Sequence, residues 1–400
     1  MQNYIYEPEG GVAIEAKWKP FSSKNVADED GRKADLSFTE DGEKPLFTRL
    51  SILIELKRDG LDAAARGQVL SGAASVLRHS PWRTFIFSVL ASKDEIEFFK
   101  TERVNGHEIL HRRSPTSLKD VEYKLYLSGL LMADAADLGL CPPSFKQWRL
   151  GPVLGMGASA IVFEASTIKR SAERAEDEVL KVYPRNAIGC AERELDILRT
   201  EVRNVAGIPR VSASEVVEDL TKKYVALPLA PKLQKWVTIT GAPTEWWTER
   251  HTQQLCSILK AAHDAGFVHR DVRPANILLD PVTDQVFLVD WDKAVEVSKR
   301  TVFEGAIRWA PATVLKTAIA AEEHDSVPAD DLVSMVNTVF MVKNPARYKK
   351  LPSFNPDRRE ESVQAILSFW EESLKGQYWQ TAKELASTTE YKQLAQHLTA

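Results

Sequence analysis

The alternation of apolar and polar positions predicts an α+β unit at the start of the chain. A short apolar run over residues 51–56 predicts a strand, residues 62–80 have helical character, and residues 84–91 and 95–100 predict a β-hairpin. The polar stretch before about residue 47 is rich in charged residues and turn formers. We expect that stretch to be a weakly structured loop or an insertion.

A long helix and a Pro-Pro pair mark the end of this first unit. Residues 121–140 carry apolar positions at helical spacing, and the two prolines that follow stop the helix. We therefore expect a first domain over residues 1–125, a helical linker over 126–148 and a second domain over 149–400.

The second domain changes its pattern part-way along. Strand-like runs cover residues 149–156, 160–166, 178–183 and 224–229. One amphipathic helix is predicted at 191–202, and the pattern becomes largely helical after about residue 245. The sequence therefore predicts a β-rich lobe over 149–230 and a helical lobe over 231–400.

Composition and charge add little to this picture. A chain of 400 residues with 44% hydrophobic content is long enough for two cores, and a net charge of -4 gives no global attraction to nucleic acid or to anionic membranes. The cysteines are scattered without metal-ligand spacing and are expected to be reduced thiols: Cys141, Cys190 and Cys256. We find no apolar run of membrane-spanning length and no signal-peptide pattern at the start, so we expect an intracellular protein, cytoplasmic or nuclear, that does not contact membranes.

Candidate phosphate-binding residues occur in the β-rich lobe. Gly155 and Gly157 lie between two predicted strands, where missing side chains would let backbone N–H groups approach phosphate oxygens. Lys181 on the next strand and Glu194 on the following helix could pair and hold an ammonium toward the same cleft. Taken singly, a plain β-turn and two surface charges would give the same residues.

The stretch VHRDVRPANILL, residues 268–279, carries the most specific signal. Asp271 could accept the proton of an attacking hydroxyl, Arg273 could balance charge on a transferred phosphoryl group, and Asn276 could hold Mg²⁺. The following strand delivers Asp290 as a second oxygen ligand, because strand and loop would form a short hairpin-like unit.

The order and spacing of these residues resemble the protein kinase fold across residues 149–400. The matching positions are Gly155, Gly157, Lys181, Glu194, His269, Arg270, Asp271, Asn276, Asp290 and Asp331. The resemblance implies a bilobal kinase domain that uses ATP and Mg²⁺ to phosphorylate a protein hydroxyl, most often of Ser or Thr. It also implies that Val162 contacts the nucleotide, that Asn276 and Asp290 bind metal, and that Asp271, Arg273, Lys181 and Glu194 serve catalysis.

Several positions depart from the kinase pattern. Ala160 replaces the third glycine of the loop, Trp291 and Asp292 replace Phe and Gly after the metal-binding aspartate, and Ala312 replaces an acid that forms a structural ion pair. The DWD triplet also resembles aminoglycoside-type phosphotransferases. A catalytically silent scaffold is a further alternative, motivated by the same substitutions.

Regulation by phosphorylation is one possibility that the sequence raises. Arg270 could clamp a phosphate on the short segment that follows, where Ser298 and Thr301 are candidate acceptors.

The first domain contains a different charged motif, IELKRDG. Glu55 and Lys57 flank one residue and therefore point to the same side of a strand. With Asp35 upstream and Gln68 downstream, they resemble the PD-(D/E)xK nuclease core. That resemblance implies a restriction-endonuclease-like α/β domain in which Asp35 and Glu55 hold Mg²⁺, Lys57 activates water, and nucleic acid is a partner. An exposed edge strand with alternating charges is the simpler alternative.

Both motifs in one chain resemble the fungal-type protein kinases, which are related to kinase-bearing Crinkler-type effectors. The likeness rests on IELKR, the Gln-bearing helix, WRTFIFSV, HRDVRPANIL and HDSVPADDLVS, and it covers nearly the whole chain after the first thirty or so residues.

Overall fold

The structure is a computed structural model. It describes residues 18–22, 36–40, 52–58, 60–80, 82–104, 107–134, 136–140, 142–157, 159–168, 178–235, 247–280, 282–320 and 322–399. The chain divides into two compact units, Met1–Pro143 and Ser144–Ala400.

In the described part of the first unit, the strands form one sheet with the order β1-β2-β3-β4-β5-β6. Strand β7 also pairs with β5. The strands are β1 (Trp18–Ser22), β2 (Leu36–Glu40), β3 (Ile52–Leu56), β4 (Phe85–Ala91), β5 (Glu95–Val104), β6 (His107–Arg112) and β7 (Thr116–Ser117). Only β3 and β4, among these strands, pair in parallel, and helix α1 (Ala63–His79) connects them. The predicted strand, helix and hairpin are confirmed.

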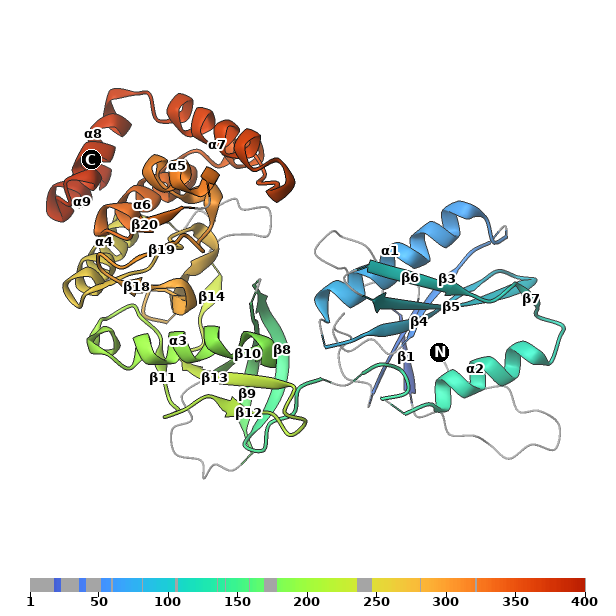
Figure 1. The fold of residues 1–400 in the computed structure, drawn as a ribbon. Coiled ribbons are helices and arrows are strands. Elements are labelled where there is room, and N and C mark those ends of the chain that lie inside the picture. The colour runs from blue at the N-terminus through green and yellow to red at the C-terminus, as the bar shows by residue number, and fades with distance from the viewer. Residues whose placement is uncertain are drawn as a thin grey trace. The chain divides into compact units, whose positions relative to one another are not determined.

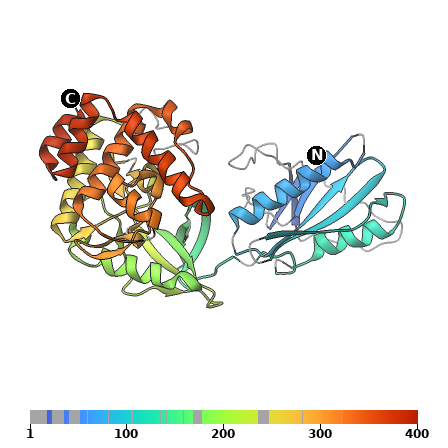
Figure 2. The same cartoon turned by 45° about the horizontal axis from the view of Figure 1, so that its top comes forward.

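Helices α1 and α2 (Glu122–Met132) cover opposite faces of this sheet (Figures 1 and 2). Leu53 of β3 packs with α1, whereas its neighbours Ile52 and Ile54 pack on the α2 side. A strand buried on both faces needs a continuous apolar run, which explains why residues 52–54 show no polar alternation.

The helix expected over residues 121–140 is shorter than predicted. Helix α2 ends at Met132, since Ala133 is extended, and a turn with Gly139 at φ +76° follows. This turn buries Leu138, whose carbonyl accepts a 2.7 Å hydrogen bond from Arg83 Nη2. Because α2 packs on the sheet, it belongs to the first unit, and the expected linker over 126–148 is not a separate element.

The polar stretch before residue 47 was expected to be weakly structured, but part of it forms strands. Residues 18–22 and 36–40 form β1 and β2, whose antiparallel pairing extends the sheet beyond β3. Alternation of apolar and polar residues in LSFTE is the strand pattern that the charged surroundings obscured.

A β-rich lobe opens the second unit. Its strands follow the order β11-β13-β10-β9-β8, with β12 also paired to β13. The elements are β8 (Trp148–Met156), β9 (Ile161–Thr167), β10 (Val179–Pro184), α3 (Ile188–Leu198), β11 (Arg210–Val211), β12 (Val217–Glu218) and β13 (Tyr224–Ala230). Helix α3 buries Ala191, Glu194, Leu195, Ile197 and Leu198. Ala191, Glu194, Leu195 and Leu198 stand at positions i, i+3, i+4 and i+7 and so form one face.

The rest of the second unit is mainly helical (Figure 1). Its helices are α4 (Glu249–Asp264), α5 (Ala312–Ala320), α6 (Pro328–Lys343), α7 (Arg359–Ser373), α8 (Gln377–Ser387) and α9 (Tyr391–Thr399). Its short strands are β14 (Gln234–Lys235), β15 (Phe267–Val268), β16 (Ile277–Asp280), β17 (Gln285–Leu288), β18 (Val295–Glu296), β19 (Arg300–Val302) and β20 (Glu323–Asp325). Helix α6 is buried along most of its length, between two apolar clusters.

This arrangement agrees with the expected α+β class and with two lobes in the second unit. None of the helices in the described part of the chain has both the length and the apolar character needed to cross a membrane.

Candidate active site

The loop between β15 and β16 holds a group of buried polar residues at the centre of the second unit. His269, Arg270, Asp271 and Asn276 are each at most 7% exposed. Arg270 has a φ of +70°, a left-handed conformation that a non-glycine residue adopts only where its surroundings impose it. The loop is therefore a fixed structure rather than a solvated connection.

Asp331, near the start of α6, fixes this loop. Its carboxylate accepts hydrogen bonds from the backbone N–H of His269 at 2.6 Å and of Arg270 at 2.8 Å, and it contacts His263 Nε2 at 2.9 Å. Burial would raise the pKa of Asp331, but the contacts with His263 and His269 outweigh it and lower that pKa. A buried, charged Asp331 therefore stabilises the strained backbone at Arg270.

Both carboxylate oxygens of Asp271 are held by neighbouring groups. Oδ2 accepts from Asn276 Nδ2 at 2.7 Å and from Arg273 Nε at 3.2 Å, while Oδ1 accepts from the Ala306 N–H at 3.1 Å. The side chain is thereby oriented by three donors from two segments.

Asp290 follows β17 in a left-handed conformation, with φ +73° and ψ +60°. Its Oδ1 lies 2.5 Å from Lys181 Nζ. The next residue, Trp291, is fully buried, stacks edge-on against His269 with ring centroids 4.6 Å apart, and donates its backbone N–H to Glu194 at 3.0 Å. These contacts join the end of β17 to α3 and to β10.

Lys181 and Glu194 form a buried ion pair. Lys181 Nζ contacts the two carboxylate oxygens of Glu194 at 3.1 and 2.8 Å, and the hydroxyl of Tyr183 donates to the same carboxylate. Burial would lower the pKa of Lys181, but Asp290 and Glu194 raise that pKa well above its ordinary range. Lys181 therefore stays an ammonium although it is only 6% exposed.

The turn between β8 and β9 carries the glycine pair. Gly155 pairs with Val162 across the hairpin, and the Gly157 N–H donates to the Ala160 carbonyl at 2.8 Å. A Cβ at Gly157 would meet the Ala160 carbonyl oxygen at 3.7 Å, an ordinary contact, so packing within the chain does not require glycine there. A glycine at position 157 would also allow a ligand to approach the backbone closely.

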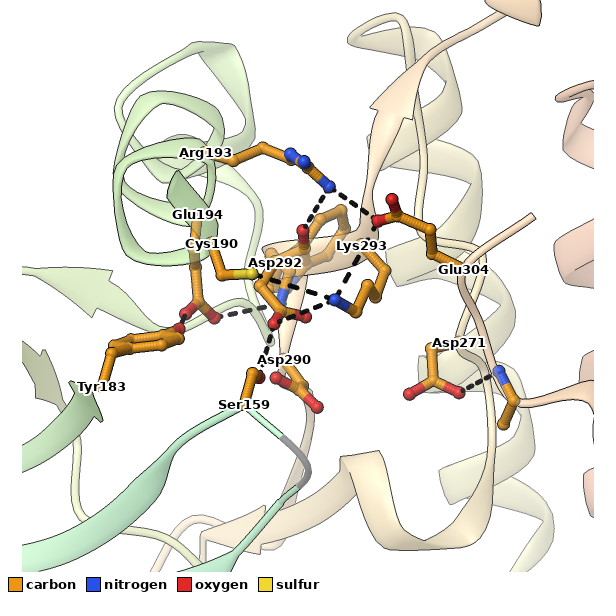
Figure 3. Close-up of polar contacts among 12 residues, drawn as sticks. Ser159, Tyr183, Cys190, Arg193, Glu194, Asp271, Asp290, Asp292, Lys293 and Glu304 are labelled. Atoms are coloured by element: carbon orange, nitrogen blue, oxygen red, sulfur yellow. Dashed lines mark hydrogen bonds and ion pairs between the residues drawn. The ribbon is translucent and has the colours of Figure 1, made fainter. Parts of the chain in front are cut away.

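This turn is joined to the segment after β17 by Ser159, whose hydroxyl donates to Asp292 Oδ2 at 2.8 Å (Figure 3). Asp292 is only 1% exposed. Burial and the neighbouring Asp290 carboxylate raise the pKa of Asp292.

Asn276 and Asp290 are the oxygen donors best placed for a cation. They lie at the same end of the β16–β17 pair, where the Val289 N–H donates to the Asn276 carbonyl at 2.9 Å. Asn276 Nδ2 donates to Asp271. The amide oxygen of Asn276 therefore points away from Asp271. Among the described residues there is no cluster of three or more His, Cys, Asp and Glu side chains suited to a metal. One carboxylate and one amide suit Mg²⁺, which takes its other ligands from phosphates and water.

The comparison with known families agrees with this geometry. The family model described as "Protein kinase domain" matches residues 148–385, which is more than half of the chain. The chain belongs to the protein kinase family. The resemblance of residues 149–400 to protein kinases is thereby confirmed at the level of the family.

Two curated kinases illustrate how distant the relatives are. CBL-interacting protein kinase 29 of Oryza sativa subsp. japonica is 30% identical over 151 residues, which cover 34% of this chain and 33% of the relative. Mitogen-activated protein kinase kinase kinase 3 of Arabidopsis thaliana is 26% identical over 182 residues, 44% of this chain and 29% of the relative. The chain thus matches about a third of the length of these relatives.

The first unit brings three of the four predicted nuclease-like residues together. Lys57 Nζ donates to Gln68 Oε1 and lies 3.6 Å from Glu55 Oε2. Lys57 and Gln68 line a pocket of about 510 Å³ together with Arg58 and Asp62. The fourth residue, Asp35, lies outside the described residues.

Sequence reasoning missed several polar residues around the kinase-family site: Tyr183, Ser159, Arg193, Lys293 and Glu304. Tyr183 could have been found, because a strand places residues 181 and 183 on the same face. The others depend on contacts between segments far apart in the sequence, such as Ser159 with Asp292, and spacing carries no signal for those.

Proposed function

We propose that the chain is an ATP- and Mg²⁺-dependent protein kinase that phosphorylates Ser or Thr hydroxyls. The observation that carries this proposal is the contact chain from Glu194 through Lys181 to Asp290, beside the oriented carboxylate of Asp271. These are the residue types that phosphoryl transfer needs, and they come from separate segments.

The β-rich lobe would bind the nucleotide. Lys181 is charged, and its contacts with Glu194 and Asp290 fix its side-chain conformation. Its ammonium would therefore be oriented in advance for the α- and β-phosphates. Gly155 and Gly157 would bring backbone N–H groups to the phosphates, and Val162 would pack against the base.

The loop after β15 would carry the transfer step. Asp271 would accept the proton of the attacking hydroxyl, and Arg273, which contacts Asp271, would offset charge on the transferred group. Asn276 and Asp290 would hold Mg²⁺, which neutralises negative charge on the phosphates when it is bound.

Two alternatives share this fold. The DWD triplet also fits a small-molecule phosphotransferase of the aminoglycoside type, and the departures at Ala160, Asp292 and Ala312 motivate a silent scaffold. The geometry favours catalysis, because Asp271, Asn276, Lys181 and Asp290 are all present and oriented.

An acceptor comparison tests the function. Purified full-length chain is incubated with γ-labelled ATP, Mg²⁺ and either a mixed protein substrate or a panel of aminoglycosides. We expect label on protein and none above background on the small molecules. Label on aminoglycosides alone would establish the small-molecule enzyme, and label on neither acceptor would favour the scaffold.

Replacing Lys181 by methionine should weaken ATP binding by about 10- to 150-fold, because a charge-assisted contact contributes about 1.5–3 kcal/mol. Titration calorimetry with Mg-ATP measures this. Lys232→Met is the matched control, because Lys232 also forms an ion pair, a part-exposed one with Glu164 of β9. Equal affinity in the Lys181 variant and in wild type would remove Lys181 from the nucleotide site.

We also propose that the first unit is a PD-(D/E)xK nuclease-like domain, and that the chain is a fungal-type protein kinase. Two observations favour this. Glu55, Lys57 and Gln68 lie together, and a helix links the parallel strands β3 and β4 beside them. Glu55 and Asp35 would hold Mg²⁺, and Arg58, which lines the same pocket, would contact a nucleic acid phosphate.

The full-length chain should then nick DNA in Mg²⁺ or Mn²⁺, and Lys57→Ala should reduce the rate to background. Lys57 is part-exposed, so the variant should keep its stability to within about 0.5 kcal/mol. Lys93→Ala, at an exposed hairpin position of the same unit, is the control and should cut at the wild-type rate. Equal cutting by the Lys57 variant and wild type would remove Lys57 from the site, and no cutting by wild type would leave a nuclease-like fold without this activity.

A further inference from the structure

Glu304, in the segment between β19 and α5, is surrounded by positive charge (Figure 3). Its Oε2 accepts a 3.0 Å hydrogen bond from Arg193 Nη1 of α3 and lies 4.0 Å from Lys293 Nζ, just after Asp292. Arg193 also donates to the Asp292 carbonyl at 3.2 Å. One carboxylate therefore joins helix α3 to the segment that follows β17.

A third cation acts on the same carboxylate. Burial would raise the pKa of Glu304, but Arg193, Lys293 and Arg270 outweigh it and lower that pKa. Arg193, Arg270 and Glu304 line one cleft between α3 and the segment 294–304. Without Glu304, the attraction that holds Arg193 to this segment would be lost, and the repulsion between Arg193 and Arg270 would no longer be offset.

The residues after Glu304 contact the catalytic loop directly. Gly305 packs so closely on Arg270 that an added Cβ would lie 2.0 Å from the Arg270 carbonyl oxygen. The Ala306 N–H then donates to Asp271 Oδ1. On the other side, Arg193 precedes Glu194, the partner of Lys181. Two residues after Glu304, Ala306 contacts Asp271. Glu304 also binds Arg193, which directly precedes Glu194 in the chain.

We propose that Glu304 is a positioning residue whose fixed carboxylate holds α3 and the 303–306 segment together, so that the site is assembled without phosphorylation of this segment. The inference rests on the proposed kinase function. A glutamate does here, permanently, what a phosphate on a hydroxyl would do by modification.

The surroundings of Arg270 support this assignment. Its guanidinium already donates to Thr301 Oγ1 at 3.3 Å and to the Val302 carbonyl at 2.7 Å, and it lies over the Phe303 ring, 5.4 Å from the centroid. Ser298 and Thr301 were candidate phosphate acceptors from the sequence, and the Thr301 hydroxyl lies against the Arg270 guanidinium.

The test compares Glu304→Gln, Glu304→Asp and Arg193→Gln in the full-length chain, with ATP and a protein substrate. Glu304→Gln keeps the size and removes the charge, so we expect kcat to fall about tenfold. Glu304→Asp keeps the charge and should stay within about threefold of wild type. The double variant Glu304→Gln/Arg193→Gln should lose less than the two single losses combined, because both changes remove the contact between Glu304 and Arg193.

Glu323→Gln is the matched control, because Glu323 of β20 forms an exposed ion pair with Arg300 of the antiparallel strand β19. We expect it to keep wild-type kcat. Wild type treated with phosphatase, and shown by mass spectrometry to be unmodified, should also keep its activity.

The outcomes separate this inference from the kinase proposal. An inactive wild type overturns the kinase function itself. An active wild type with an equally active Glu304→Gln variant, or additive losses in the double variant, overturns the role of Glu304. Loss of activity on dephosphorylation overturns assembly without modification.

Discussion

Replacing Asp271 by asparagine should lower kcat by about 10²- to 10⁴-fold, the usual contribution of a positioned general base. Asparagine has almost the same shape, and its amide oxygen can still accept a hydrogen bond from Asn276 or Ala306. It cannot accept the proton of an attacking hydroxyl. The affinity for ATP should therefore change little while the transfer rate falls.

Steady-state phosphorylation and ATP calorimetry on the same preparation measure both quantities. Asp280→Asn is the matched control, since Asp280 ends β16, the strand after this loop, and its carboxylate accepts hydrogen bonds from Val282 and Thr283. A kcat within threefold of wild type for Asp271→Asn would show that Asp271 is not the base.

Replacing Asp331 by alanine should cost about 2–6 kcal/mol of unfolding free energy, because two buried backbone N–H groups would each lose their acceptor at a cost of about 1–3 kcal/mol. The change leaves the N–H groups of His269 and Arg270 without the acceptor that holds their backbone, and it leaves His263 without its carboxylate. Denaturant unfolding followed by circular dichroism measures the loss. In the variant, the second unit should unfold at a lower denaturant concentration than it does in wild type.

The stability of wild type should also depend on pH through this residue. The folded pKa of Asp331 lies below its unfolded value of about 3.9, so its stabilisation is present above that value and is lost as pH falls through the folded pKa. Asp264→Ala on α4 is the control, because the exposed Asp264–Lys260 pair should contribute less than about 1 kcal/mol. Equal stability losses in the two variants would contradict the structural role of Asp331.

Much of the site could be predicted because its residues occur in one fixed order. The loop carrying Asp271 and Asn276 is local in sequence, and β16–β17 pairing follows from two apolar runs around a turn. Lys181 and Glu194 were harder to place, since each taken singly resembles a surface charge, and only the neighbouring motifs favoured their pairing.

Contacts between distant segments could not be predicted. The Ser159–Asp292 bond spans 133 residues and the Arg193–Glu304 pair spans 111, and neither has a characteristic spacing. The end of α2 was also missed, because the apolar spacing continues to Leu138 through a turn rather than a helix. Tertiary packing decided that boundary against local periodicity.

The most direct test of the central claim is phosphoamino acid analysis of a protein substrate incubated with γ-labelled ATP and the full-length chain. The account predicts label on serine or threonine that requires Mg²⁺. Folded protein that binds ATP but leaves every serine and threonine unlabelled, with Mg²⁺ present and the substrate in excess, would contradict it.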